Sequence, residues 1–121
     1  MRRSADFDVT VRRGARAGRS TLVVHCRAAA DAGTGTRVGL VVSRAVGGAV
    51  VRNKVRRRLR GVVVEQRAAL PEGADLVVRA LPPSGGVDYA TLTADFRSAL
   101  HAATRRAGLD AEPPDARGGS R

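Results

Sequence analysis

The spacing of apolar positions predicts a short helix near the start of the chain and a strand after it. Phe7 and Val11 lie four positions apart, so a helix over residues 4–13 places them on one face. Gly14 ends this helix. Residues 20–28 alternate with a period of two, which is typical of a strand with one buried face.

The alternation in this strand separates a core face from an opposite face. Leu22, Val24 and Cys26 are expected to face the core, and Val23, His25 and Arg27 to face the other way. Residues 31–36 are rich in turn-forming types, and residues 37–43 have the pattern of a second strand. We therefore expect these two strands to follow one another as a hairpin.

The longest amphipathic pattern begins near Ala49, after the helix-breaking pair Gly47 and Gly48, and continues to about residue 70. A helix of 3.6 residues per turn gathers its apolar positions in one stripe, which predicts a central helix packed against the core. The stripe consists of Val51, Val55, Leu59 and Val62.

The next part of the chain is predicted to add a buried strand and a last helix. Residues 74–81 form a compact apolar run, which implies a strand, helix, strand crossover. Asp88 is a suitable N-cap and Gly108 a suitable end for the last helix. Its apolar face consists of Tyr89, Leu92, Phe96, Leu100 and Ala103. Residues 109–121 are rich in Pro, Gly and charge, so we expect one domain over residues 1–108 and a disordered tail.

The amino-acid composition limits the classes of binding partner that suit this domain. A chain of 121 residues suffices for one domain with a modest core. Its 22 Lys plus Arg against 11 Asp plus Glu give a formal charge of +11, which favours nucleic acid first and an anionic membrane surface second. Aromatic residues make up only 2%, which argues against RNA recognition by rows of stacking rings.

The sequence offers little for metal binding, catalysis or membrane insertion. Cys26 is the one cysteine and the chain has two histidines, so a zinc site of the usual spacing cannot be assembled. His25 and His101 are isolated, and no paired acidic motif suits a catalytic metal. No apolar stretch approaches the length of a membrane span. We therefore expect a cytoplasmic protein with no catalytic residues and no metal of its own.

The segment 52–60, RNKVRRRLR, makes the central helix strongly basic. It holds six cations, one Asn and no acid. These like charges repel one another within a few turns, and a polyanion would offset the resulting destabilisation. Phosphate contacts from such a helix would give strong, salt-dependent binding along a structured RNA backbone. The alternative is a solvated helix face in an arginine-biased chain, since only Lys54 among the 22 cations is lysine.

These residues carry a family resemblance. The stretch from Gly39 to Arg60, GLVVSRAVGGAVVRNKVRRRLR, resembles the signature region of the bacterial ribonuclease P protein component. In that family a strand ends in V-S-K-K, a V-G-x-A-V turn follows, and R-N-R-x-K-R-x-x-R lies on a helix. The matching residues are Val42, Ser43, Arg44, Val46, Gly47, Ala49, Val50, Arg52, Asn53, Arg57 and Arg60. Lys54 and Arg56 exchange the usual cation type, and the resemblance covers most of the chain before the tail.

The resemblance implies an α+β fold, a single-domain αβββα-type two-layer sandwich like domain 2 of ribosomal protein S5. This agrees with the three helices and three main strands that the patterns predict. It also implies that the central basic helix lies in a left-handed βαβ crossover, whereas general sheet geometry predicts a right-handed one.

The resemblance further implies a protein subunit of the ribonuclease P ribonucleoprotein. Such a subunit binds the catalytic RNA and the 5′ leader of precursor tRNA and promotes endonucleolytic removal of the leader. The RNA hydrolyses the phosphodiester with Mg²⁺, so the protein is not catalytic and binds no cofactor alone. We expect one protein per RNA subunit and no membrane contact.

The resemblance also assigns roles to particular residues. The residues expected to bind the catalytic RNA are Arg44, Arg52, Asn53, Lys54, Arg56, Arg57 and Arg60. Arg58 lies close to the apolar stripe and is expected to extend over the core instead. Phe7, Val11 and His25 are expected to line a cleft for the single-stranded leader. Phe7 equally suits core packing, and His25 an exposed strand position.

Two other classes of protein fit parts of the pattern. A ribosomal or other structural RNA-binding protein would use the same basic helix without stimulating any cleavage. A helix-turn-helix DNA-binding protein is less consistent, because the segment before the basic helix is predicted to be a strand.

Overall fold

The computed structural model describes the backbone of residues 4–29 and 35–109, with side chains described from residue 9 onward in these ranges. Three helices, four strands and three short 3₁₀ turns follow one another in this part of the chain. They are α1 (Ser4–Arg13), β1 (Ala15–Gly18), β2 (Leu22–Ala28), β3 (Arg37–Val41), η1 (Arg44–Val46), α2 (Ala49–Glu65), η2 (Arg67–Ala69), β4 (Ala74–Ala80), η3 (Pro82–Gly86) and α3 (Tyr89–Arg106). All three predicted helices are confirmed, with α2 ending a few residues earlier than expected.

The four strands form one sheet in the order β1-β2-β4-β3. Val78 of β4 lies opposite Val24 of the antiparallel β2 and opposite Leu40 of the parallel β3. The predicted hairpin between β2 and β3 is therefore wrong, because β4 separates them. The physical reason is burial: β4 is buried at all but one position and takes the interior of the sheet, whereas β3 is mostly half-buried and takes an edge.

The sheet also contains a strand that the sequence patterns missed. β1 has four residues and pairs antiparallel with β2, with Arg16 opposite His25 and Ala17 opposite Val24. Only Ala17 of this strand is buried, so no alternation of large apolar residues marks it in the sequence. β1 and β3 are thus the two edges of the sheet.

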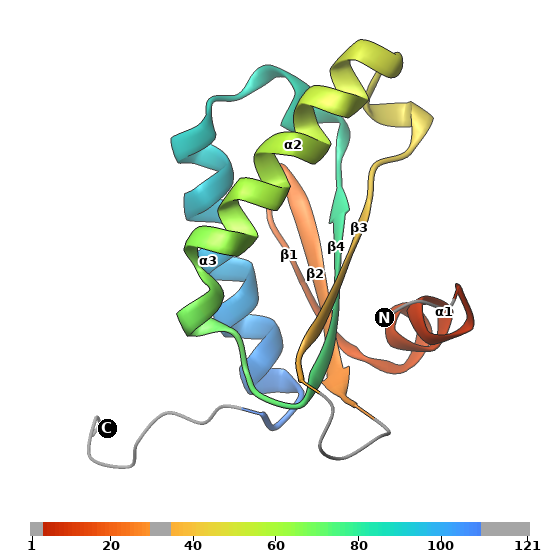
Figure 1. Cartoon of the computed structure of the whole chain (residues 1–121), viewed down its shortest axis with the longest axis vertical. Helices are drawn as coiled ribbons and strands as arrows, with labels where there is room; N and C mark the ends of the chain where they lie inside the picture. Colours follow the sequence, from red (N-terminus) through yellow and green to blue (C-terminus); the bar gives the residue numbers. More distant parts are fainter. Residues whose placement is uncertain (1–3, 30–34, 110–121) are drawn as a thin grey trace.

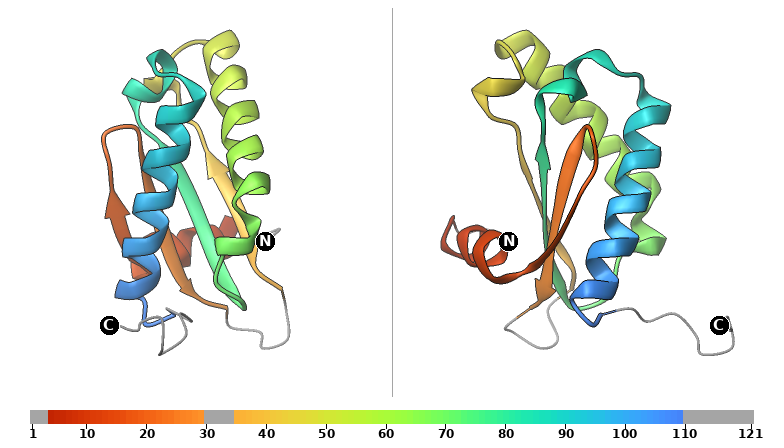
Figure 2. Two further views of the ribbon diagram at one scale, coloured as in Figure 1. Left: turned by 90° about the vertical axis from the view of Figure 1, so that its left-hand side faces the viewer. Right: turned by 180° about the vertical axis from the view of Figure 1, so that it is seen from behind.

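Helices cover the two faces of the sheet unequally (Figure 1). α2 and α3 lie side by side on one face, and α1 lies on the opposite face near one end, as Figure 2 shows. The two long helices and the sheet form the layers of an α+β sandwich, and α1 adds a partial third layer. The core between them includes Leu22, Val24, Cys26, Val55, Leu59, Val62, Leu76, Val78, Leu92, Phe96 and Leu100.

The predicted apolar faces of α2 and α3 are confirmed. Val55, Leu59 and Val62 are buried in the core. Val51 of the same stripe is half-buried. On α3 the buried residues include Leu92, Phe96, Leu100 and Ala103. Asp88 caps α3 as expected, because its carboxylate accepts a 2.8 Å hydrogen bond from the Thr91 N–H.

Gly14 joins α1 to β1 at a point where two backbones meet. Its N–H donates to the carbonyl oxygen of Thr10 at 2.9 Å. A Cβ at this position would lie 2.6 Å from that oxygen and 2.8 Å from the carbonyl oxygen of Cys26. The absence of a side chain therefore lets α1 approach β2 closely.

Leu109 is the last described residue, and it packs half-buried against the core. The rest of the predicted tail lies outside the described residues. Within the described ranges, no helix has the length and apolar character needed to cross a membrane.

Candidate nucleic-acid interface

The cations of α2 lie outside the buried stripe of the helix. No acidic residue occurs in α2 before Glu65 at its end. Asn53, Arg57 and Arg60 are exposed, and Arg52, Lys54 and Arg56 are half-buried. None of these cations forms an ion pair within the part of the chain that the structure describes. Their charge is therefore available to a phosphate backbone.

Two details shape the geometry of this surface. Arg56 Nη1 donates a 3.0 Å hydrogen bond to Asn53 Oδ1, which directs that guanidinium along the helix. Arg52 Nε is buried and has no hydrogen-bond partner among the described residues. A buried donor without a partner is unusual in a folded protein. An oxygen atom of a bound ligand would satisfy it.

Arg58 contributes to the fold. Its Nη1 donates a 2.9 Å hydrogen bond to the carbonyl oxygen of Val87, in the turn before α3. The side chain is half-buried. Arg58 thus lies over the protein, as the sequence predicted, and ties α2 to the start of α3.

Arg44 lies in η1, the turn that leads from β3 to α2. The Ser43 hydroxyl caps this turn by accepting a 3.3 Å hydrogen bond from the Ala45 N–H. Gly47 then adopts a φ of 155°, and a Cβ there would lie 3.0 Å from the side chain of Val51. The turn packs against α2, and Arg44 is exposed on this turn, just before the N-terminal end of the helix.

The three residues predicted to line a leader cleft lie on α1 and β2. α1 packs against β2 and β4 on the face opposite the main core. Val11 is half-buried, and the side chain of Phe7 lies outside the described part of the chain. His25 is on the predicted face but only 1% exposed, so its interpretation as an exposed strand residue is wrong.

The surroundings of His25 keep it neutral. Both ring nitrogens are buried without a hydrogen-bond partner in the described ranges. Burial lowers the pKa of His25, and the positive charges of Arg79 and Arg16 lower it further. Each of these effects disfavours the protonated form, so the imidazole is uncharged at neutral pH.

Arg79 is a residue that the sequence analysis did not single out. It is the one cation in the apolar run over residues 74–81. Leu76 and Val78 belong to the core, so the alternation of the strand places Arg79 on the opposite face, where it is half-buried. The feature of the sequence that could have identified Arg79 is a single cation inside an otherwise apolar strand.

Two other ionisable groups of the sheet, Asp75 and Cys26, are buried. Arg37 Nε lies 3.1 Å from Asp75 Oδ1 in an ion pair between β3 and β4. Burial raises the pKa of the Cys26 thiol to about 11, so it is protonated at neutral pH. No group of three or more His, Cys, Asp or Glu side chains that suits a metal occurs among the described residues. The interface that these residues offer is therefore cationic.

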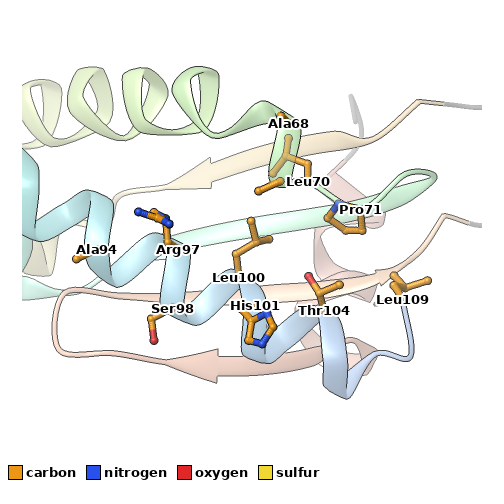
Figure 3. Close-up of a pocket in the computed structure, with 11 residues that line it drawn as sticks. Ala68, Leu70, Pro71, Ala94, Arg97, Ser98, Leu100, His101, Thr104 and Leu109 are labelled. Carbon is orange, nitrogen blue, oxygen red and sulfur yellow. The ribbon is translucent and has the colours of Figure 1, made fainter. Parts of the chain in front are cut away.

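A groove of about 770 Å³ lies between α3 and residues 68–71, which belong to η2 and the loop that follows it (Figure 3). Leu70, Pro71 and Leu100 contribute to its apolar lining, and Arg97 and His101 lie among its polar residues. None of the predicted RNA-binding or leader-binding residues lines it. The groove is therefore separate from the basic surface of α2.

The sequence matches known proteins over most of its length. A family model described as Ribonuclease P matches residues 1–104. The chain belongs to the ribonuclease P protein family. Ribonuclease P protein components of Streptomyces bikiniensis and Kocuria rhizophila are 52% and 54% identical to it, over 83% and 88% of this chain and 87% and 92% of their own.

Solved structures of ribonuclease P proteins share the fold. The RNase P protein from Thermotoga maritima has a TM-score of 0.72 and 28% identity, and the match covers 83% of this chain and 93% of that protein. The RNase P protein of Staphylococcus aureus has a TM-score of 0.74 and 23% identity, with coverage of 85% and 93%.

Membership of the ribonuclease P protein family defines the general role of the chain. It is a subunit of ribonuclease P, an RNA-binding protein of tRNA processing, and is associated with the ribonuclease P RNA. The helix-turn-helix alternative is wrong, because α2 lies between the strands β3 and β4.

Proposed function

We propose that this ribonuclease P protein binds the catalytic RNA through α2 and η1. It contacts the 5′ leader of precursor tRNA from the side of the sheet that carries α1. The observation that supports this is the row of α2 cations without ion pairs in the described part of the chain. The proposed contacts to the catalytic RNA are Arg44, Arg52, Asn53, Lys54, Arg56, Arg57 and Arg60.

In this proposal the RNA subunit hydrolyses the phosphodiester with Mg²⁺, and one copy of the protein per RNA contributes charge and position. Two RNAs repel one another when the leader approaches the catalytic RNA. A protein of formal charge +11 between them offsets this repulsion. Cleavage then releases the leader and leaves the mature 5′ end of the tRNA.

The leader side of the proposal involves Phe7, Val11 and His25. The packing of α1 on β2 and β4 supports it, because this packing brings α1 and the His25 face of the sheet together. A left-handed crossover of the kind found in domain 2 of ribosomal protein S5 belongs to the same proposal. The parallel pairing of β3 and β4, the strands that α2 connects, supports the βαβ crossover itself, and its left hand is what the resemblance implies.

The test is cleavage of a leader-bearing precursor tRNA by bacterial ribonuclease P RNA at low Mg²⁺, with and without the protein. The wild-type protein is expected to stimulate cleavage strongly. A double Arg57→Ala and Arg60→Ala variant should lose most of this stimulation, because both side chains are exposed on α2. A double Arg97→Ala and Arg105→Ala variant removes the same charge from exposed positions on α3 and should retain it.

Two results would contradict the proposal. Tight, salt-sensitive RNA binding by the wild type without any stimulation would favour a structural RNA-binding role. Equal loss of stimulation in both double variants would show that total charge matters and that α2 has no special part.

A further inference from the structure

The groove beside α3 combines an apolar surface with basic side chains that have no partner. It lies between α3 and residues 68–71, with Leu70, Leu100 and the buried Pro71 in its lining (Figure 3). Arg97 and His101 line its α3 side, and both are exposed. Neither side chain has a hydrogen bond or an ion pair within the described residues. Such a surface suits a segment that carries both apolar groups and carboxylates.

The end of α3 directs the chain into this groove. Gly108 has a φ of 73°, and its N–H donates a 3.0 Å hydrogen bond to the carbonyl oxygen of Arg105. The N–H of Leu109 donates a 3.0 Å hydrogen bond to the carbonyl oxygen of Thr104. These two bonds form a Schellman motif, which turns the chain back over the last turn of the helix. Leu109 is half-buried and lines the groove, so the described chain ends in the groove itself.

The residues that follow have the chemistry that the groove requires. Residues 110–115 are DAEPPD, with three acids and no cation. The acids are Asp110, Glu112 and Asp115. The two prolines supply apolar rings and fix their own φ angles, so the segment loses less conformational entropy on binding than a flexible one. The segment is therefore complementary to the groove in both charge and apolar character.

The segment also has a suitable length. Arg97, His101 and Arg105 follow one another at every fourth residue of α3, so they lie on one side of the helix. The helix advances about 12 Å from Arg97 to Arg105. An extended segment advances about 16 Å from Asp110 to Asp115. The length of an arginine side chain spans the difference, so a segment that runs back along α3 brings its carboxylates level with these three side chains.

Attachment to the chain favours this segment over other occupants of the groove. A single exposed ion pair is weak. The segment begins directly after Leu109, however, so it is held beside the groove at an effective concentration of about millimolar. A second copy of the chain or an acidic partner protein has to compete with that concentration.

We propose that residues 110–115 bind back along α3 in the groove of their own chain, with their carboxylates beside Arg97, His101 and Arg105. For this segment the proposal replaces the disorder that composition alone predicts. The bound segment keeps the α3 cations from binding phosphate and leaves α2 as the accessible basic helix. The inference does not depend on the proposed function, because the contact forms within the protein in the absence of RNA.

The test places a nitroxide spin label on the full-length protein and measures the broadening of backbone amide NMR signals. Cys26 is buried, so Ala116→Cys provides the accessible thiol for the label. Relative to the reduced label, signals of residues 94–101 and 68–71 should lose most of their intensity. Signals of residues 49–53 should keep theirs, because the start of α2 lies at the other end of the molecule from the end of α3 (Figure 1).

Charge variants on both sides of the contact provide the controls. Arg97→Gln with Arg105→Gln should restore most of the lost intensity. Arg57→Gln with Arg60→Gln makes the matched change at exposed positions on α2 and should leave the broadening as in the wild type. A neutral-tail variant should also restore the intensity. It carries Asp110→Asn, Glu112→Gln and Asp115→Asn, all beyond the last described residue.

Binding to a noncognate duplex RNA tests whether the segment keeps phosphate from α3. The slope of log affinity against log salt concentration should be steeper for the neutral-tail variant than for the wild type. The increase should be about 0.9 for each α3 cation that gains a phosphate contact. It should vanish when Arg97 and Arg105 are also replaced by Gln.

Three outcomes would overturn the inference. The first is equal broadening in the wild type and the neutral-tail variant. The second is broadening that appears only between a spin-labelled chain and a separate isotope-labelled chain, which would assign the groove to the segment of a second copy. The third is an unchanged salt slope in the neutral-tail variant, which would show that the segment does not keep phosphate from α3.

Discussion

His25 combines the packing of a ring with the electrostatics of an ionisable group. It is one of the largest fully buried side chains, and it lies on the part of β2 that faces α1. Its nitrogens have no partners in the described residues, and two arginine charges act on it. The folded protein therefore holds this imidazole in its neutral form at the expense of hydrogen bonds.

The stability of the protein should depend on pH through His25. The ordinary pKa of 6.5 is lowered in the folded state, so below about pH 6.5 the unfolded chain binds more protons than the folded one. The free energy of unfolding should therefore fall as the pH falls from 6.5 toward the lowered pKa. His25→Phe removes the titration and the unpartnered nitrogens, and should be more stable by about 1 kcal/mol. Denaturant unfolding at several pH values checks this, and an unchanged pH dependence in the variant would contradict it.

The alternation of residues 20–28 predicted the face of the strand on which His25 lies, but it did not predict how deeply His25 is buried. Direction follows from strand geometry alone, since successive side chains of a strand alternate between its faces. Burial depends on α1, a helix that reaches β2 through the close approach at Gly14. Arg79 was missed for a similar reason, because the charged and buried groups near it, such as His25, lie on other strands.

At the scale of elements, local patterns predicted the helices well and the strand order poorly. The apolar stripe of α2 and the Asp88 cap of α3 are encoded within one or a few turns. The position of β4 between β2 and β3 is a long-range choice that depends on which strand is buried on both faces. β1 is too short and too small in its side chains to show a period.

Neighbouring arginines on α2 should affect different properties. Arg58 donates to the Val87 carbonyl oxygen and holds α2 against the turn before α3, so Arg58→Ala should lower the free energy of unfolding by about 1–2 kcal/mol. Arg57 is exposed, so Arg57→Ala should leave stability within about 0.5 kcal/mol and weaken binding of the catalytic RNA. Denaturant unfolding and RNA titration of both variants check this. A stability loss in Arg57→Ala as large as that in Arg58→Ala would contradict it.

At the scale of the whole molecule, the functional prediction rested on two properties of the sequence, its net charge and its family signature. Net charge indicated a polyanion, and the segment from Gly39 to Arg60 indicated the family to which the chain belongs. The contacts that distinguish Arg58 from its neighbours depend on α3, which follows much later in the chain. They required the folded structure.

The logarithm of the affinity for the catalytic RNA should fall linearly with the logarithm of the salt concentration. The slope counts neutralised phosphates, at about 0.9 for each contact on a duplex and about 0.7 on a single strand. Arg57→Ala with Arg60→Ala should therefore reduce the slope by nearly two contacts, whereas Arg97→Ala with Arg105→Ala should not change it. A salt series of binding titrations measures this, and equal slopes for the first variant and the wild type would contradict the assignment of α2.

The place of β4 in the sheet has a consequence for synthesis of the protein. β4 is the last strand to be translated, yet it lies between β2 and β3. Until residue 80 has left the ribosome, β3 has no strand to pair with, and α2 has no completed sheet to pack on. A helix of 17 residues with many like charges is marginal on its own. The basic segment is therefore synthesised well before the sheet that fixes the geometry of its side chains is complete.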